Sequence, residues 1–126
     1  MRILIIEDDR FFSNYLSKLI KKHFDAAVDI EADAVDAYEA LTKKAYDLVF
    51  LDVALCDTNG LALLSQIASS NVYGILPIIV TSTMADIVPD KLLKRYGVKG
   101  VLNKVTMHPD DVIKIVRKYK NEERKT

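Results

Sequence analysis

The sequence predicts an α/β domain built on a doubly wound parallel sheet with helices on both faces. Short unbroken apolar runs recur at "ILII" (3–6), "LVFL" (48–51) and "IIV" (78–80), as in central strands that helices cover on both sides. Segments with helical periodicity lie between these runs. Strand and helix therefore alternate five times along the chain, which is the order expected for this fold class.

The first strand, 3–6, leads into a helix for which Asp9 is a suitable cap. In this helix the apolar residues recur every three or four positions, which predicts one buried stripe along it. The stripe consists of Phe12, Tyr15, Leu16, Leu19, Ile20, His23 and Phe24. The second strand, "AVDIEA" (27–32), alternates in polarity, which is typical of a strand with one exposed face.

The middle and last thirds continue the alternation. Shorter helices are predicted at 34–44 and 60–68, on either side of the strand at 48–51. The fifth strand has only a weak apolar signal, "VL" (101–102).

Proline and glycine mark the ends of the last two helices. Pro89 and Pro109 are suited to a first helical turn, and Gly97 is suited to end the helix that starts near Pro89. The last helix is expected from about Pro109 to Tyr119.

Length and composition limit the possible functions. A chain of 126 residues, 50% hydrophobic, suits one domain over 1–120, with 121–126 as a charged tail or the start of a linker. The 18 basic and 18 acidic residues cancel, which argues against non-specific nucleic-acid binding. One cysteine fits a reducing cytosol, and the first apolar run is too short for a signal peptide or a membrane span. We therefore expect a cytoplasmic protein.

Polar residues follow the predicted strands, where ligand sites of open α/β sheets lie. The strand ends carry Glu7 and Asp8, Asp52, the hydroxyl residues Thr81, Ser82 and Thr83, and finally Asn103 and Lys104. Three acids, a hydroxyl and a lysine are thus expected at one edge of the sheet.

Three carboxylates at one edge need compensation. At about 5 Å and an effective dielectric near 20, each ionised pair repels by roughly 3 kcal/mol. Either one acid holds a proton or a cation is present, and oxygen ligands with room for water suit magnesium. An aspartate beside magnesium and Lys104 is a credible phosphoryl acceptor.

Each feature also has an ordinary structural explanation. "EDD" is typical of a solvated turn with a helix cap. An aspartate such as Asp52, followed by a turn and a glycine, is typical of a residue whose side chain hydrogen-bonds the turn backbone. Ser82 or Thr83 could cap a helix, and Lys104 could be a surface charge. Their joint position at four strand ends favours a functional site.

From "ILIIEDD" through "LVFLDVALCDTNG" and "PIIVTS" to "GVLNK", the chain resembles the receiver domain of two-component response regulators, of the chemotaxis-regulator type. The resemblance implies a flavodoxin-like fold with five helices and five parallel strands in the order 2-1-3-4-5. It also implies magnesium dependence and phosphoryl transfer from a histidine kinase or histidine phosphotransfer protein. A downstream protein partner or output domain would be switched, without direct binding to nucleic acid or membrane.

The resemblance also implies roles for the acids. Asp52 would be the phosphoacceptor. Magnesium would be held by Asp8, Asp52 and the backbone carbonyl of Ala54, and Glu7 would reach the metal directly or through water.

The other implied roles concern the phosphoryl group. Ser82, with Thr83 beside it, would supply the switch hydroxyl, and Lys104 would pair with the acyl phosphate. Ala54 and Met84, two residues after the acceptor and the switch hydroxyl, would set the lifetime of the phosphorylated state.

The chain departs from the family pattern at three positions. Val101 replaces the usual aromatic, so no ring can report phosphorylation there. Val105 replaces the proline after the lysine, and a non-proline cis peptide bond costs about 3 kcal/mol more. Cys56 replaces a proline four residues after the acceptor. These changes concern signal output more than phosphorylation.

Two other functions fit parts of the sequence. The altered switch positions favour a receiver-like interaction module that works without phosphorylation, whereas the complete set of acids, hydroxyl and lysine argues against it. A small phosphatase of the haloacid dehalogenase type would need a second aspartate where Ala54 stands. We therefore expect no enzyme beyond self-catalysed phosphotransfer to Asp52 and slow autodephosphorylation.

Overall fold

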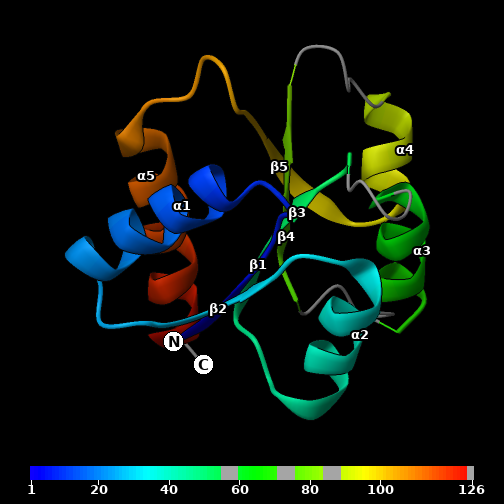
Figure 1. The fold of residues 1–126 in the computed structure, drawn as a ribbon, viewed down its shortest axis with the longest axis horizontal. Coiled ribbons are helices and arrows are strands. Elements are labelled where there is room, and N and C mark those ends of the chain that lie inside the picture. The colour runs from blue at the N-terminus through cyan, green and yellow to red at the C-terminus, as the bar shows by residue number, and fades with distance from the viewer. Residues whose placement is uncertain (55–59, 71–75, 84–88, 125–126) are drawn as a thin grey trace.

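The computed structural model describes residues 1–54, 60–70, 76–83 and 89–124, which form a parallel sheet with helices on both faces (Figure 1). The elements are β1 Arg2–Ile6, α1 Arg10–His23, β2 Ala27–Glu31, α2 Ala34–Lys43, β3 Leu48–Asp52, α3 Gly60–Ser70, β4 Ile78–Ser82, α4 Asp90–Arg95, β5 Val98–Asn103 and α5 Pro109–Arg124. The strand order is β2-β1-β3-β4-β5 and every pairing is parallel. The predicted fold and strand order are confirmed.

The central strands are buried along their whole length. Every residue of β3 and of β4 is buried, in agreement with the unbroken apolar runs that predicted them. The edge strand β2 contains no fully buried residue, as its alternating sequence indicated. β5 forms the other edge and is mostly half-buried or exposed.

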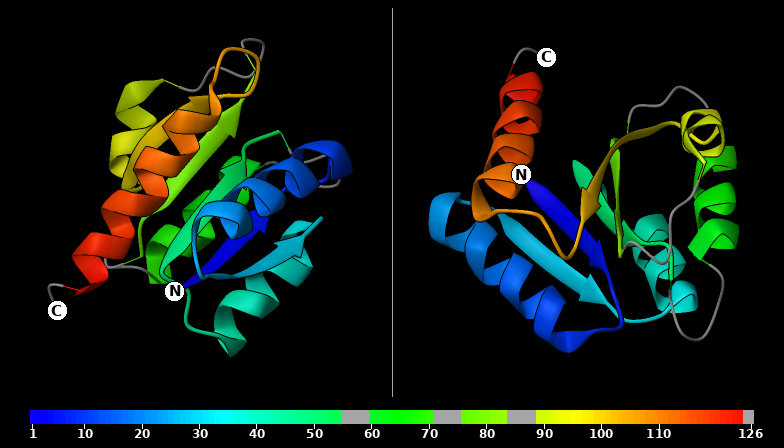
Figure 2. Two further views of the ribbon diagram at one scale, coloured as in Figure 1. Left: turned by 90° about the vertical axis from the view of Figure 1, so that its left-hand side faces the viewer. Right: turned by 90° about the horizontal axis from the view of Figure 1, so that it is seen from above.

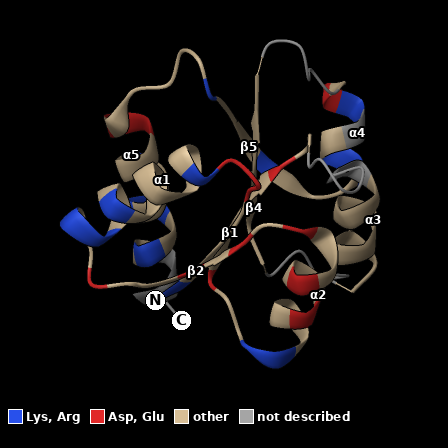
Figure 3. Ribbon diagram, in the orientation of Figure 1, with Lys and Arg blue, Asp and Glu red and all other residues tan. Residues whose placement is uncertain are grey.

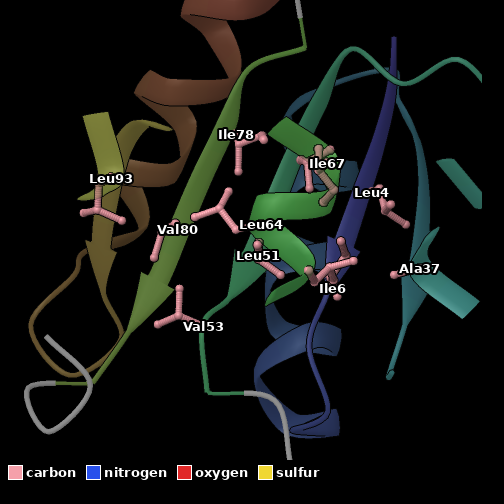
Figure 4. Close-up of a cluster of buried hydrophobic side chains, with 12 residues drawn as sticks. Leu4, Ile6, Ala37, Leu51, Val53, Leu64, Ile67, Ile78, Val80 and Leu93 are labelled. Carbon is pink, nitrogen blue, oxygen red and sulfur yellow. The ribbon is translucent and has the colours of Figure 1, made fainter. Parts of the chain in front are cut away.

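Two layers of helices cover the sheet (Figure 2). On one face, α1 and α5 pack on Ile3, Ile5 and Phe50. On the other face, α2, α3 and α4 enclose a second cluster, in which Leu51, Leu64 and Val80 point toward one another (Figure 4). Both faces of the sheet are thus closed by apolar side chains, and polar chemistry is confined to its edges and strand ends.

Most residues predicted to mark helix ends lie where the sequence placed them. Asp9 caps α1, and its Oδ1 accepts from the backbone N–H of Phe11 at 2.9 Å. Pro109 is the first residue of α5, whereas Pro89 precedes the first residue of α4. Gly97 has a φ of 75°, a left-handed conformation that suits glycine after the end of α4.

Two expectations about the helices need revision. The buried face of α1 runs through Ser13, Leu16, Ser17 and Ile20, whereas Tyr15 is 42% exposed and His23 is also exposed. Two small serines are buried on this face, so the buried stripe is rotated relative to the purely apolar one. α5 continues through Arg124, beyond the expected end near Tyr119.

None of the helices in the described part of the chain combines the length and hydropathy that a membrane span requires.

A polar cluster around Asp29 joins β2 to the segment before β3. Asp29 Oδ2 accepts a hydrogen bond from the Tyr46 hydroxyl at 2.6 Å and pairs with Lys44 Nζ at 3.2 Å and Arg2 Nη1 at 3.5 Å. The hydrogen bond from Tyr46, together with the charges of Lys44 and Arg2, outweighs burial and lowers the pKa of Asp29.

Asp29→Asn should therefore weaken the acid dependence of stability. Because the pKa of Asp29 is lower in the folded than in the unfolded chain, its carboxylate stabilises the fold above the ordinary pKa, and this contribution is lost as pH falls through the lowered value. With a quarter of the side chain exposed, we expect the substitution to lower the free energy of unfolding at neutral pH by about 1 kcal/mol. Urea unfolding at neutral pH and at about pH 3 measures this, with the exposed Asp25→Asn as the matched control. An equal loss at both pH values would show that the ionised carboxylate is not the cause.

Candidate functional site

The acids predicted to converge do so at the carboxyl ends of the two adjacent strands β1 and β3. Glu7 and Asp8 follow β1 directly, and Asp52 is the last residue of β3. One carboxylate oxygen from each of these three residues lies within 4.8 Å of the others. Figure 3 shows the two acidic strand ends next to each other. A hydrogen bond from Glu7 N to Glu31 O, at 3.0 Å, continues the sheet pairing and fixes the backbone at Glu7.

The Asp52 carboxylate is buried and held on both sides, with 3% of the residue exposed. Its Oδ1 accepts from the backbone N–H of Ala54 at 3.0 Å, in the turn that follows β3. Its Oδ2 lies 3.2 Å from Lys104 Nζ. The backbone N–H of Ala54 and the Lys104 ammonium therefore both orient this carboxylate.

Lys104 supplies the positive charge of the site. It follows β5, and its backbone N–H donates to Ser82 O at 2.7 Å, which fixes it beside the end of β4. Its Nζ pairs with Glu7 Oε1 as well as with Asp52, and 15% of its side chain is exposed. Burial alone would lower the pKa of Lys104, but the Glu7 and Asp52 carboxylates raise it. The lysine therefore stays charged among the acids.

Glu7 shows the electrostatic cost of this arrangement. Burial, together with the hydrogen bond and charge of Asp52, raises the pKa of Glu7 to about 7, although Lys104 acts in the opposite direction. This agrees with one of the two conditions expected from the sequence, because Glu7 can hold a proton near neutral pH. The three carboxylates also suit a hard divalent cation such as magnesium, which prefers oxygen ligands and retains water.

The hydroxyl residues lie at the neighbouring strand end. β4 ends at Ser82, which is buried, and Thr83 follows it, half-buried. The preceding residue, Thr81, pairs with Asp52 in the sheet register. These residues are therefore next to the acids in the sheet, and the switch role of Ser82 and Thr83 stays a prediction.

The remaining predicted positions fall outside the group of charged residues. Ala54 is exposed in the turn after Asp52, whereas Met84 and Cys56 lie outside the described residues. Val101, on β5, is 49% exposed, and Val105, which follows β5, is 71% exposed. No cis peptide bond occurs among the described residues, so the bond between Lys104 and Val105 is trans.

One neighbour of the charged residues was not predicted. The ring of Phe12, in the first turn of α1, has its centroid 4.9 Å from Lys104 Nζ. The sequence placed Phe12 only in an apolar stripe. Its position in the first turn of the helix that starts from the acidic strand end, four residues after Asp8, is the signal that could have indicated it.

Comparison with known proteins gives consistent matches along the chain. The family model described as the response regulator receiver domain matches residues 3–117. The regulator of RpoS from Escherichia coli (strain K12) is 38% identical over 104 residues, which are 82% of this chain and 30% of that protein. The response regulator ArlR from Staphylococcus saprophyticus is 33% identical over 85 residues, 68% of this chain and 37% of that protein. The chain thus spans about a third of the length of these curated relatives.

Solved structures have the same fold. A response regulator receiver domain protein (CheY-like) from Methanospirillum hungatei JF-1 superposes with a TM-score of 0.84 at 22% identity, covering 99% of this chain and 98% of that one. The response regulatory domain of protein mrkE from Klebsiella pneumoniae gives a TM-score of 0.84 at 18% identity, with 100% of both chains covered. At these identities the likeness concerns the fold alone.

Proposed function

Because the chain belongs to the family of response regulator receiver domains, we propose that it accepts a phosphoryl group on Asp52 with the help of magnesium and switches a protein partner or output domain. The observation that carries this proposal is the buried Asp52 carboxylate, held at a strand end within reach of Glu7, Asp8 and Lys104. The donor would be the phosphohistidine of a histidine kinase or a histidine phosphotransfer protein. We place this chemistry in the cytoplasm, without direct contact to nucleic acid or membrane.

In the proposed reaction an Asp52 carboxylate oxygen attacks the phosphorus atom of the donor. The new bond joins that oxygen to phosphorus, while the bond between phosphorus and the donor nitrogen breaks and the nitrogen keeps the electron pair. The contact of Lys104 with Oδ2 places an ammonium where negative charge on the phosphoryl oxygens would be stabilised. The backbone N–H of Ala54 orients the carboxylate through Oδ1.

The acids would hold the metal. Asp8 and Asp52 would ligate magnesium through carboxylate oxygens, the backbone carbonyl of Ala54 would complete the protein ligands, and Glu7 would bind directly or through water. When bound, magnesium neutralises charge on the transferring phosphoryl group. Burial contributes most to the raised pKa of Glu7, and a divalent cation would offset the contribution from the charge of Asp52.

The signal would leave through β4 and β5. Ser82, with Thr83 beside it, would take a phosphoryl oxygen through its hydroxyl, and the hydrogen bond from Lys104 N to Ser82 O ties the ends of the two strands together. Movement at Ser82 would then reach Val101, which is half exposed on β5. Because Val101 has no ring to turn inward, we expect the output to be a shift of strand and turn backbone.

Intact-mass measurement with acetyl phosphate, a small phosphodonor, tests the proposal. The parent protein should gain the mass of one phosphoryl group in the presence of magnesium, and much less after chelation. If no mass is gained with magnesium and excess donor, the proposed chemistry is wrong. Val101 in place of the aromatic would then favour a receiver-like module that binds its partner without phosphorylation.

The phosphorylated state should be long-lived. Hydrolysis needs a water in line with the acyl phosphate, and neither the methyl of Ala54 nor the thioether of Met84 can orient and activate it as an amide or carboxylate could. We expect loss of phosphate to be about tenfold slower than in the double variant Ala54→Asn, Met84→Glu, a barrier difference of about 1.4 kcal/mol. Loading the protein, removing the donor and following the mass over time measures this. Loss within seconds, or equal rates in both proteins, would show that these positions do not set the lifetime.

A further inference from the structure

Two adjacent phenylalanines lie in the first turn of α1, and they have different surroundings. Phe11 is 91% exposed. Phe12 is half-buried against the cluster beneath α1 and α5, and its ring lies 4.9 Å from Lys104 Nζ. At this distance the ring face attracts the ammonium. The first turn of α1 therefore places an aromatic ring beside the Lys104 ammonium, which also pairs with the carboxylates of Glu7 and Asp52.

We propose that Phe12 is the positioning residue of Lys104, whose ring keeps the ammonium beside Asp52 while the phosphoryl group is transferred. The inference rests on the proposed function, in which Lys104 stabilises the transferring phosphoryl group. In this role Phe12 does not contact the reacting atoms, and it affects the reaction only through Lys104.

Lys104 needs such a residue because the carboxylates that hold its ammonium also take part in the reaction. Among the residues that the structure describes, the ammonium forms ion pairs with Glu7 and Asp52, and both carboxylates are needed for metal or phosphorus when the reaction proceeds. The backbone of Lys104 stays fixed through Ser82 O, but a flexible four-carbon stem separates it from the ammonium. Without a further contact, the ammonium would become free to leave at the moment when it is required.

An aromatic ring meets this need better than a third acid would. The ring attracts the cation through its face without fixing the direction of any N–H bond, so the ammonium can turn its donors toward a phosphoryl oxygen. The ring carries no net charge and does not repel the incoming phosphoryl group as a carboxylate would. Only 15% of the Lys104 side chain is exposed, and this partial exclusion of water strengthens the attraction.

The first test compares the variants Phe12→Leu, Phe12→Tyr and Phe11→Leu with the parent. Phosphorylation of Asp52 is followed over a range of acetyl phosphate concentrations at saturating magnesium. We expect Phe12→Leu to lower the maximal rate about tenfold with little change in KM, because the ring acts on the transition state. Phe12→Tyr keeps a ring face and should restore the rate to within about twofold. Phe11→Leu, the matched loss of an exposed ring, should equal the parent.

A second test separates positioning from packing. In a Lys104→Met background, Phe12→Leu should cause no additional slowing, because the ring has no ammonium left to hold. A packing role would slow both backgrounds by the same factor, and that result would overturn the inference. The ring current provides an independent readout, since the Cε protons of Lys104 should lie upfield in the parent and in Phe12→Tyr, and should lose this shift in Phe12→Leu.

The outcomes distinguish the inference from the function on which it rests. If the parent is phosphorylated and Phe12→Leu reacts at the same rate, the positioning role is overturned and the proposed function stands. If the parent is not phosphorylated at all, the proposed function fails and the inference fails with it. A tenfold loss that depends on Lys104 and is restored by tyrosine supports both.

Discussion

Asp52→Asn should abolish phosphorylation of the protein by small donors. The substitution keeps the size of the side chain but replaces the attacking carboxylate oxygen with an amide, which is a far weaker nucleophile. The Asp52 carboxylate is buried, oriented by Ala54 N–H and contacted by Lys104, so we expect the rate to fall by more than about 100-fold. Removal of one buried acid from a group of three should leave the fold intact or stabilise it.

Intact-mass spectra after incubation with acetyl phosphate and magnesium measure the effect. Asp25→Asn is the matched control, since it makes the same chemical change at an exposed aspartate that follows α1. The control should be labelled like the parent. Equal labelling of Asp52→Asn and the parent would show that another residue accepts the phosphoryl group.

Asp8→Asn should slow the magnesium-dependent phosphorylation by weakening metal binding. Asp8 supplies one of the three carboxylate oxygens that lie within 4.8 Å of one another, and its loss removes a full negative charge from the proposed metal ligands. We expect the rate at a fixed millimolar magnesium concentration to fall about 100-fold, or roughly 2.7 kcal/mol of barrier. Raising the magnesium concentration should recover part of this loss.

The neighbouring Asp9→Asn provides the control for this variant. Asparagine caps a helix as well as aspartate does, so α1 should keep its start while the charge changes by the same amount. Labelling rates measured across a magnesium titration should be near the parent values for Asp9→Asn and shifted to higher concentrations for Asp8→Asn. Identical titrations for both variants would place the metal elsewhere.

Much of the fold could be predicted because the strongest sequence signals belong to its centre. The unbroken apolar runs of β1, β3 and β4 became the most buried strands of the sheet. β5 was the weakest prediction, since it includes Lys99 and Gly100 and lies half-exposed at the edge, where burial does not demand an apolar run. On α1, Ser13 and Ser17 were missed because a small hydroxyl residue can be buried against a sheet without contributing to an apolar pattern.

The site followed from topology more than from any single residue. Once the strands are parallel and in this order, Glu7, Asp8 and Asp52 must share an edge, and the close approach of their oxygens follows from the pairing of β1 with β3. The contact of Phe12 with Lys104 depends on how α1 crosses the sheet and on two side-chain rotamers, which residue spacing does not determine. The same holds for the contacts of Lys104 with Glu7 and Asp52 at once.

The central claim is that Asp52 carries the phosphoryl group, and chemical trapping of the acyl phosphate tests it most directly. Borohydride reduces an aspartyl phosphate to homoserine, so the protein is treated with acetyl phosphate and magnesium, reduced, digested and sequenced by tandem mass spectrometry. We predict homoserine at position 52, dependent on both donor and magnesium. Homoserine at Asp8 or at another aspartate instead of position 52, or none anywhere in a protein that has gained phosphoryl mass, would contradict the claim.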